Sequence, residues 1–268
     1  MPENIKELRK ICQGDKGKGR GILYFIFCRS LSIYLTKILL KTKITPNQVT
    51  IFSILTGIIG VLLIFLNTVT TTIIGLFLIY LWLFLDKVDG EIARYKNLHS
   101  IQGIYLDQIA HMLIVPTFFF ATGYIAYLET SSNPALFLGF TSALFPLLVR
   151  FEYKLPYQIF AQRAIRNPTL LNKIKNQTQE KSTTKPKTII NISSKLSDEY
   201  LKILILFIAF IADFFITTLN LKLIALSFFT IIYLTFFLHN TYSSYKKSLD
   251  KKTKDIYQLT KEKIQNET

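Results

Sequence analysis

Long apolar runs alternate with short polar segments along most of the chain. Six such runs are expected to be helical. The first lies at residues 47–67, and the second begins at 72 and continues into a polar stretch that starts at 86. The other four lie at 103–127, 135–149, 202–219 and 223–240. Each is close to the ~20 apolar residues that a helix needs to cross a bilayer. The pattern therefore predicts an all-α polytopic membrane protein, with six transmembrane helices in a domain over residues 45–240.

A basic segment, residues 1–44, precedes the first run. Its residues 21–41 are apolar but carry Arg29, Lys37 and Lys41, which fall within an arc of about 120° when each residue turns a helix by 100°. This pattern is typical of an amphipathic helix that lies in the membrane interface with its cations toward anionic headgroups. A steeply inserted helix is the alternative.

The first run opens on a helix-start signal. Thr45 is a good N-cap residue and Pro46 suits the first helical position. Because a helix N-terminus favours anions, Asn47 and Thr50 are candidate ligand-binding residues beside it. A capping motif with no further role explains the same residues.

The basic residues predict the orientation of the chain. The formal net charge is +15, and 31 of the 32 Lys and Arg residues fall on one side of the predicted crossings, with Lys222 on the other. They include those of a polar, Lys-rich loop at 151–201 and a tail at 241–268. By the positive-inside rule, both termini are then cytoplasmic. The six-span length and the lack of organelle signals favour a prokaryotic plasma membrane.

The richest polar stretch lies between the second and third runs, at residues 86–111. One helical face carries residues at i, i+3, i+4, i+7 and i+8, namely Asp86, Asp89, Gly90, Ala93 and Arg94. A second face carries Gly103, Asp107 and His111. If the two helices are antiparallel neighbours, three carboxylates, an arginine and a histidine converge on one pocket. Ionisable groups beside apolar spans are costly, which indicates a functional site, although solvated charges at two helix ends are the simpler alternative.

These residues resemble the signature of the CDP-alcohol phosphotransferase (CDP-alcohol phosphatidyltransferase) family, Asp-x2-Asp-Gly-x2-Ala-Arg, eight or nine residues, then Gly-x3-Asp-x3-Asp. Seven positions match, and His111 stands where the family has its fourth Asp. The resemblance implies an integral membrane transferase that moves a phosphoalcohol group from a CDP-linked donor to an acceptor hydroxyl and releases CMP. It also implies a homodimer, an interfacial N-terminal helix, and contacts of Gly90 and Ala93 with the CMP half of the donor.

The same residues suit that chemistry. Asp86, Asp89 and Asp107 offer oxygen ligands for a divalent metal, Mg²⁺ or Mn²⁺, which would neutralise the diphosphate. Arg94 offers a two-pronged donor for the diphosphate, unless it only reaches to the interface. His111, with an ordinary pKa of about 6.5, is the candidate general base, and imidazole suits Mn²⁺ better than Mg²⁺. A structural histidine and a site without transfer activity are the alternatives.

Other classes of function fit less well. Nucleic-acid binding would call for a soluble basic domain or a known motif, and the sequence shows neither. A small transporter would predict charges near the bilayer midplane and some repeat symmetry, whereas the charge cluster lies at one membrane face and no repeat is evident. Asp213, within the fifth predicted span, has no assigned role. A catalytically silent relative that binds nucleotide or lipid is the second hypothesis. Both CDP-diacylglycerol and a CDP-linked polar alcohol are open as the donor, and the acceptor alcohol is open too. The reaction would belong to phospholipid or related phosphodiester biosynthesis.

Overall fold

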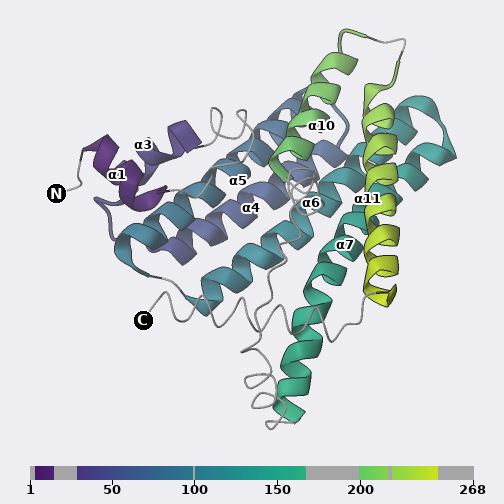
Figure 1. The fold of residues 1–268 in the computed structure, drawn as a ribbon. Coiled ribbons are helices and arrows are strands. Elements are labelled where there is room, and N and C mark those ends of the chain that lie inside the picture. Colours follow the sequence, from purple (N-terminus) through teal and green to yellow (C-terminus); the bar gives the residue numbers. More distant parts are fainter. Residues whose placement is uncertain (1–3, 15–28, 99, 167–198, 217–218, 247–268) are drawn as a thin grey trace. The chain divides into compact units, whose positions relative to one another are not determined.

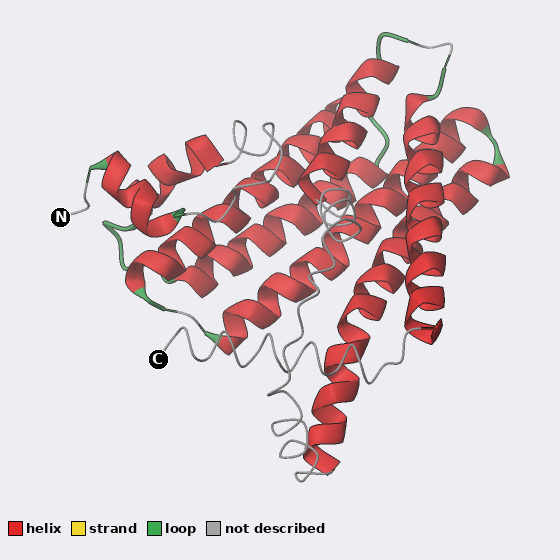
Figure 2. Cartoon of the chain, viewed as in Figure 1, coloured by secondary structure: helices red, strands yellow, loops and turns green. Residues whose placement is uncertain are grey.

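The described residues are helical throughout, with short connecting turns. The computed structural model describes residues 4–14, 29–98, 100–166, 199–216 and 219–246, and no strand occurs among them (Figure 2). The helices are α1 (Ile5–Cys12), α3 (Ser30–Leu39), α4 (Pro46–Phe65), α5 (Val69–Lys96), α6 (Ile101–Thr130), α7 (Asn133–Arg166), α10 (Glu199–Asp213) and α11 (Leu221–Lys246). The predicted all-α class is confirmed, whereas most of the loop at 151–201 and of the tail at 241–268 lies outside the described residues.

Five helices in the described part of the chain have the length and apolar composition of membrane spans. They are α4, α5, α6, α7 over Asn133–Pro156, and α11 over Leu221–Ser244. The expected crossing at 202–219 corresponds to α10, which has 15 residues and ends at Asp213. The chain is therefore a polytopic membrane protein, and a sixth crossing stays a prediction.

The chain divides into two compact units, and the first contains both halves of the polar stretch at 86–111. This unit comprises Met1–Ala143 with Ile192–Phe228, and the second comprises Leu144–Asn191 with Phe229–Thr268. Within the second unit, Thr241 donates a hydrogen bond to Glu152 at 2.9 Å. Helix α7 continues to Arg166, past the expected end of its apolar run at 149, because Arg, Glu, Lys and Gln are good helix formers.

Helix α4 packs against both α5 and α6 (Figure 1). Its crossing with α5 is close because glycines face each other there. A Cβ added at Gly60 would lie 2.9 Å from the Gly75 carbonyl oxygen, and one added at Gly75 would lie 2.6 Å from that of Gly60. Small residues let membrane helices approach in this way. The crossing sets how the residues at the start of α4 and the end of α5 face each other.

Helix caps set where these elements begin and end. The predicted start at Thr45 is confirmed: its side chain accepts from the Gln48 N–H at 3.4 Å, and Gln48 Oε1 accepts from the Thr45 N–H at 2.9 Å. Helix α5 ends at Asn97, which has a left-handed φ of 51°. Helix α6 starts three residues later, where Ser100 Oγ accepts from the Gly103 N–H at 2.9 Å. This short connection turns the chain so that the two motif helices lie near each other.

The N-terminal helices pack on the end of α5 that carries the motif. Leu8 and Cys12 of α1 and Ile33 of α3 are fully buried there, with Tyr95 of α5 packed against them. Of the three cations expected to face headgroups, Arg29 is instead buried, because its guanidinium donates to the Gln13 carbonyl oxygen at the end of α1. A helical wheel of residues 21–41 could not predict this partner, because Gln13 lies outside that segment.

Asp213 has polar partners at the opposite ends of the spans from the motif. Its Oδ2 lies 2.9 Å from Lys222 Nζ, and its Oδ1 accepts from the Leu221 N–H at 2.7 Å. Lys222 Nζ also lies 2.9 Å from a Glu129 carboxylate oxygen. These side chains line a cavity of about 250 Å³ together with residues of α5, α6, α10 and the turn between α4 and α5. Asp213 therefore joins α6, α10 and α11 through one buried lysine.

Replacing Lys222 by Met is expected to destabilise the protein by about 3 kcal/mol, because it leaves buried carboxylate charge without its cation. Lys222 is 4% exposed, so the lost ammonium cannot be replaced readily by water. The thermal unfolding midpoint in detergent would report the change. Lys41→Met, at an exposed position, is the matched control. An unchanged midpoint for Lys222→Met would contradict a stabilising role for the cluster.

Candidate metal and substrate site

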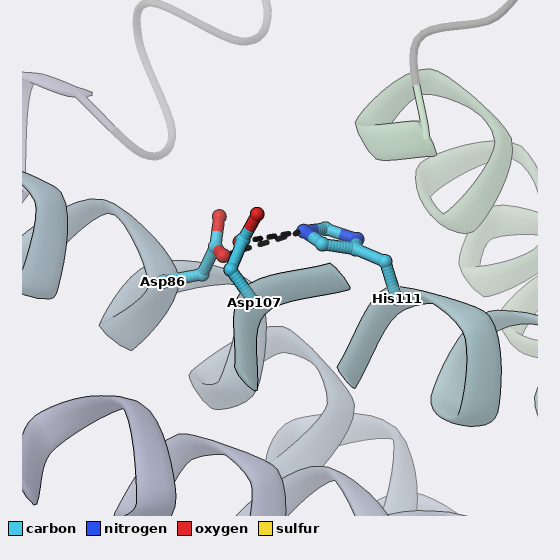
Figure 3. A group of neighbouring side chains, drawn as sticks. All are labelled: Asp86, Asp107 and His111. Atoms are coloured by element: carbon cyan, nitrogen blue, oxygen red, sulfur yellow. Dashed lines mark hydrogen bonds and ion pairs between the residues drawn. The ribbon is translucent and has the colours of Figure 1, made fainter. Parts of the chain in front are cut away.

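Two helices bring together three of the predicted site residues. Asp86 of α5 and Asp107 and His111 of α6 each offer one ligand atom, and these atoms lie within 4.8 Å of one another (Figure 3). His111 Nε2 is 3.3 Å from Asp86 Oδ1 and 3.5 Å from Asp107 Oδ1. The side chains of Asp86 and His111 are 8% and 11% exposed, whereas that of Asp107 is 41% exposed. The cluster is thus walled by protein on the α5 side and open to solvent at Asp107.

The donor atoms of this cluster fit a divalent metal ion. Two carboxylate oxygens are hard ligands that suit Mg²⁺ and Mn²⁺, and an imidazole nitrogen shifts the preference toward Mn²⁺ or Zn²⁺. The other oxygen of Asp86, Oδ2, pairs with Lys87 Nζ at 2.6 Å. Sequence reasoning missed Lys87, because residues at i and i+1 of a helix do not share a face.

Asp89, the third predicted metal ligand, has a hydrogen-bond partner on α4. Thr50 Oγ1 donates to Asp89 Oδ2 at 2.6 Å and lies 3.1 Å from the Pro46 carbonyl oxygen. Thr50 is 5% exposed, so this contact is shielded from water. The structure therefore groups Asp86 and Asp107 with His111, and Asp89 with Thr50.

Asn47 lies beside the first turn of α6. Its Oδ1 accepts from Ser100 Oγ at 3.1 Å, and a Cβ added at Gly103 would come within 2.8 Å of that oxygen. Gly103 therefore leaves room for the Asn47 side chain between the starts of α4 and α6. Asn47 therefore holds the start of α6 against the start of α4.

The remaining motif residues lie at the end of α5. A Cβ added at Gly90 would lie 3.2 Å from Arg94 Nη1, so the guanidinium folds back over Gly90. Arg94 Nε donates to the Cys12 carbonyl oxygen of α1. Ala93 is partly buried on the same helix. Arg94 is thus a motif residue with a partner in the N-terminal segment, which its spacing alone could not indicate.

Trp82 and Glu91 are two residues of α5 that sequence reasoning missed. Trp82 is fully buried, and its ring meets that of His111 edge-on, with 5.2 Å between the ring centroids. It precedes Asp86 by four residues, so helical spacing could have found it on the motif face. Glu91 is also buried, at 2% exposed, and it points away from the three-residue cluster toward α1 and α3.

Comparisons with known proteins match the part of the chain that carries this cluster. Residues 43–174 match the family described as CDP-alcohol phosphatidyltransferase, and both helices of the cluster lie within that range. Over 182 residues the chain is 27% identical to the "Bifunctional IPC transferase and DIPP synthase" of Thermococcus kodakarensis. The alignment covers 67% of this chain and 40% of that protein, so the chain spans about two fifths of its relative's length. The resemblance seen in the motif is thus confirmed by a match to the CDP-alcohol phosphatidyltransferase family over residues 43–174.

Proposed function

We propose that this protein is an integral membrane transferase that moves a phosphoalcohol group from a CDP-linked donor to an acceptor hydroxyl and releases CMP. The observation that carries the proposal is the convergence of Asp86, Asp107 and His111 from two helices within the family-matched residues. Positioned groups of this kind suit phosphoryl transfer, which depends mainly on placement and charge stabilisation.

A divalent cation, Mg²⁺ or Mn²⁺, would be held by Asp86 and Asp107, with Asp89 as a further carboxylate on α5, which leaves His111 Nε2 to act as the base. When bound, such a cation neutralises the diphosphate and the charge that develops on the leaving phosphate. Thr50 keeps the Asp89 carboxylate oriented through its 2.6 Å hydrogen bond.

In the proposed reaction, the acceptor oxygen forms a bond to the phosphorus that carries the donor's alcohol. The bond between that phosphorus and the CMP oxygen breaks, and CMP leaves with the electron pair. The hydroxyl proton passes to His111 Nε2, the ring atom that faces the two carboxylates. General-base help of this kind contributes ~10²- to 10⁴-fold to a rate.

The other motif residues would bind the donor. Arg94 offers its guanidinium fork to the diphosphate. Gly90 and Ala93 have small side chains that leave room for the CMP half. Asn47 and Thr50 at the start of α4 border the nucleotide. The donor class, CDP-diacylglycerol or a CDP-linked polar alcohol, is not distinguished by these residues because they face the shared CDP half.

The proposal includes the setting of the site. The basic residues that flank the apolar helices support a cytoplasmic site with both termini on that side of a prokaryotic plasma membrane. The family supports a homodimer within the lipid bilayer. Trypsin treatment of right-side-out vesicles would test the orientation, because a cytoplasmic tail is protected there and is cut once the vesicles are opened.

The deciding experiment is CMP release by purified protein. CDP-diacylglycerol or CDP-linked head groups would be supplied with pooled lipid and polyol acceptors, with Mg²⁺ or Mn²⁺, and with a chelator as the control. We expect CMP that requires both the metal and an acceptor. Metal-dependent donor binding without CMP from any donor would instead identify a catalytically silent relative.

A further inference from the structure

Glu91 is a buried carboxylate of α5 that has no part in the reaction proposed above. It is 2% exposed. Its Oε1 accepts from Gln13 Nε2 and from Ser32 Oγ, both at 2.7 Å, and its Oε2 accepts from Thr36 Oγ1 at 2.6 Å. Gln13 caps the end of α1, and Ser32 and Thr36 lie one turn apart on α3. Three donors from the N-terminal helices therefore meet on one carboxylate of the motif helix.

We call α1 and α3, with Gln13 and Arg29, the N-terminal collar. Its buried apolar residues, Leu8, Cys12 and Ile33, pack beside Tyr95 of α5. A carboxylate is costly to bury unless hydrogen bonds satisfy it, so Glu91 is stable in this place only when the collar supplies its donors. Conversely, the collar loses three polar anchors if Glu91 is removed.

The collar also holds Arg94. The Cys12 carbonyl oxygen, at the end of α1, accepts from Arg94 Nε. The other edge of the guanidinium lies over Gly90, with Nη1 3.2 Å from the place a Cβ would take there. One edge of the guanidinium is thus fixed on the collar, and the Nη edge is turned toward the motif face. Fixing a long side chain before binding reduces the entropy lost when a ligand is bound.

We propose that Glu91 is a positioning residue, which docks the N-terminal collar on α5 so that the Cys12 carbonyl orients the Arg94 guanidinium over Gly90. The ligand of that guanidinium, the diphosphate of a CDP-linked molecule, rests on the proposed function. The docking of the collar does not, because it depends only on contacts within the chain. The two parts can therefore be tested separately.

The docking is tested by the reactivity of Cys12. In a Cys28→Ser background Cys12 is the sole cysteine, and it is fully buried where the collar packs on α5. We expect slow labelling by a maleimide in native membranes. Labelling should be at least about tenfold faster in Glu91→Ala, because each lost hydrogen bond to a charge favours opening by about that factor. Glu91→Gln should label as slowly as the parent protein, because an amide can pair with the same three side chains once the Thr36 hydroxyl accepts.

Further variants serve as controls for the labelling result. Glu7→Ala removes an acidic residue from the exposed face of α1 and should leave the labelling rate unchanged. A thermal unfolding midpoint for Glu91→Ala close to that of the parent would show that the spans remain folded. If Glu91→Ala does not accumulate, the double variant Ser32→Ala, Thr36→Ala keeps the carboxylate and removes two donors. Equal labelling of parent and altered proteins would overturn the docking.

The action through Arg94 is tested by CDP binding, measured by titration calorimetry in detergent. Glu91→Ala should weaken CDP binding about tenfold, the value of one charge-assisted hydrogen bond. The double variant Glu91→Ala, Arg94→Ala should bind CDP almost as well as Arg94→Ala alone. A general loosening of the fold would instead make the two losses of CDP affinity additive, and that result would overturn the assignment. Wild-type protein that binds no CDP would overturn it as well. CDP binding without CMP release would count against the proposed reaction alone.

Discussion

Replacing Asp107 by Ala is expected to lower metal-dependent CMP release by roughly 10³-fold, since losing a metal ligand removes several kcal/mol of transition-state charge stabilisation and each 1.4 kcal/mol is tenfold. Its Oδ1 lies 3.5 Å from His111 Nε2. Asp107 is the cleanest member of the cluster to change because its side chain is 41% exposed. Asp86, by contrast, is buried and paired with Lys87, so its loss would affect folding as well.

The measurement for Asp107→Ala is the rate of CMP release at saturating donor, with Mg²⁺ and with Mn²⁺. Gln108→Ala, the next residue along α6, is the control, because consecutive helical residues do not share a face. An equal thermal unfolding midpoint would show that the loss is chemical. The direct binding of Mn²⁺, followed by its electron paramagnetic resonance signal, should weaken in parallel. Full metal-dependent activity in Asp107→Ala would exclude this residue as a metal ligand.

The convergence of Asp86, Asp107 and His111 could be predicted from the sequence. Helical spacing placed the residues on one face of each helix, and the short polar connection predicted that the two faces meet. The structure confirms the meeting through a turn at Asn97 and a cap at Ser100. The information is local in both cases, because each helix has its own periodicity and its own end signals.

The partner of Asp89 could not be predicted in the same way. Its contact with Thr50 depends on how α4 is rotated against α5, and that rotation is set by the Gly60 and Gly75 crossing, far along both helices. The burial of Arg29 and of Glu91 could not be predicted for the same reason. A helical wheel shows which face of its own helix carries a charge. Whether that charge is buried depends on a second segment that packs there, and the wheel holds no information about that segment.

The end of α10 shows a further limit. An apolar run from 202 to 219 predicts one span, with Asp213 inside it. In the structure, Asp213 closes α10 and accepts hydrogen bonds from the N–H groups of Leu221 and Lys222 at the start of α11. The first N–H groups of a helix need such acceptors. The aspartate is therefore a cap between two helices, and hydrophobicity alone cannot distinguish that from a charge within a span.

Replacing His111 by Ala is expected to lower CMP release by roughly 10²- to 10⁴-fold, the usual contribution of a positioned general base. The reason lies in the geometry of Nε2, which is 3.3 Å from Asp86 Oδ1 and 3.5 Å from Asp107 Oδ1, where an acceptor hydroxyl near the cluster can deliver its proton. His239→Ala, at an exposed position of α11, is the matched control and should keep full activity. The turnover rate and the thermal unfolding midpoint would be measured together.

His111→Asp separates the chemical role of this position from a packing role. A carboxylate restores the base found in the family's pattern and adds an oxygen ligand beside the metal. Activity should therefore return in part, and Mg²⁺, which prefers oxygen ligands, should support this variant better than it supports the parent protein. If His111 only packs against Trp82, to which its ring lies edge-on, the two substitutions would lower stability and leave the turnover rate unchanged. A smaller His111→Ala effect than the His111→Asp effect would likewise contradict the base assignment, because a base of either kind is better than none.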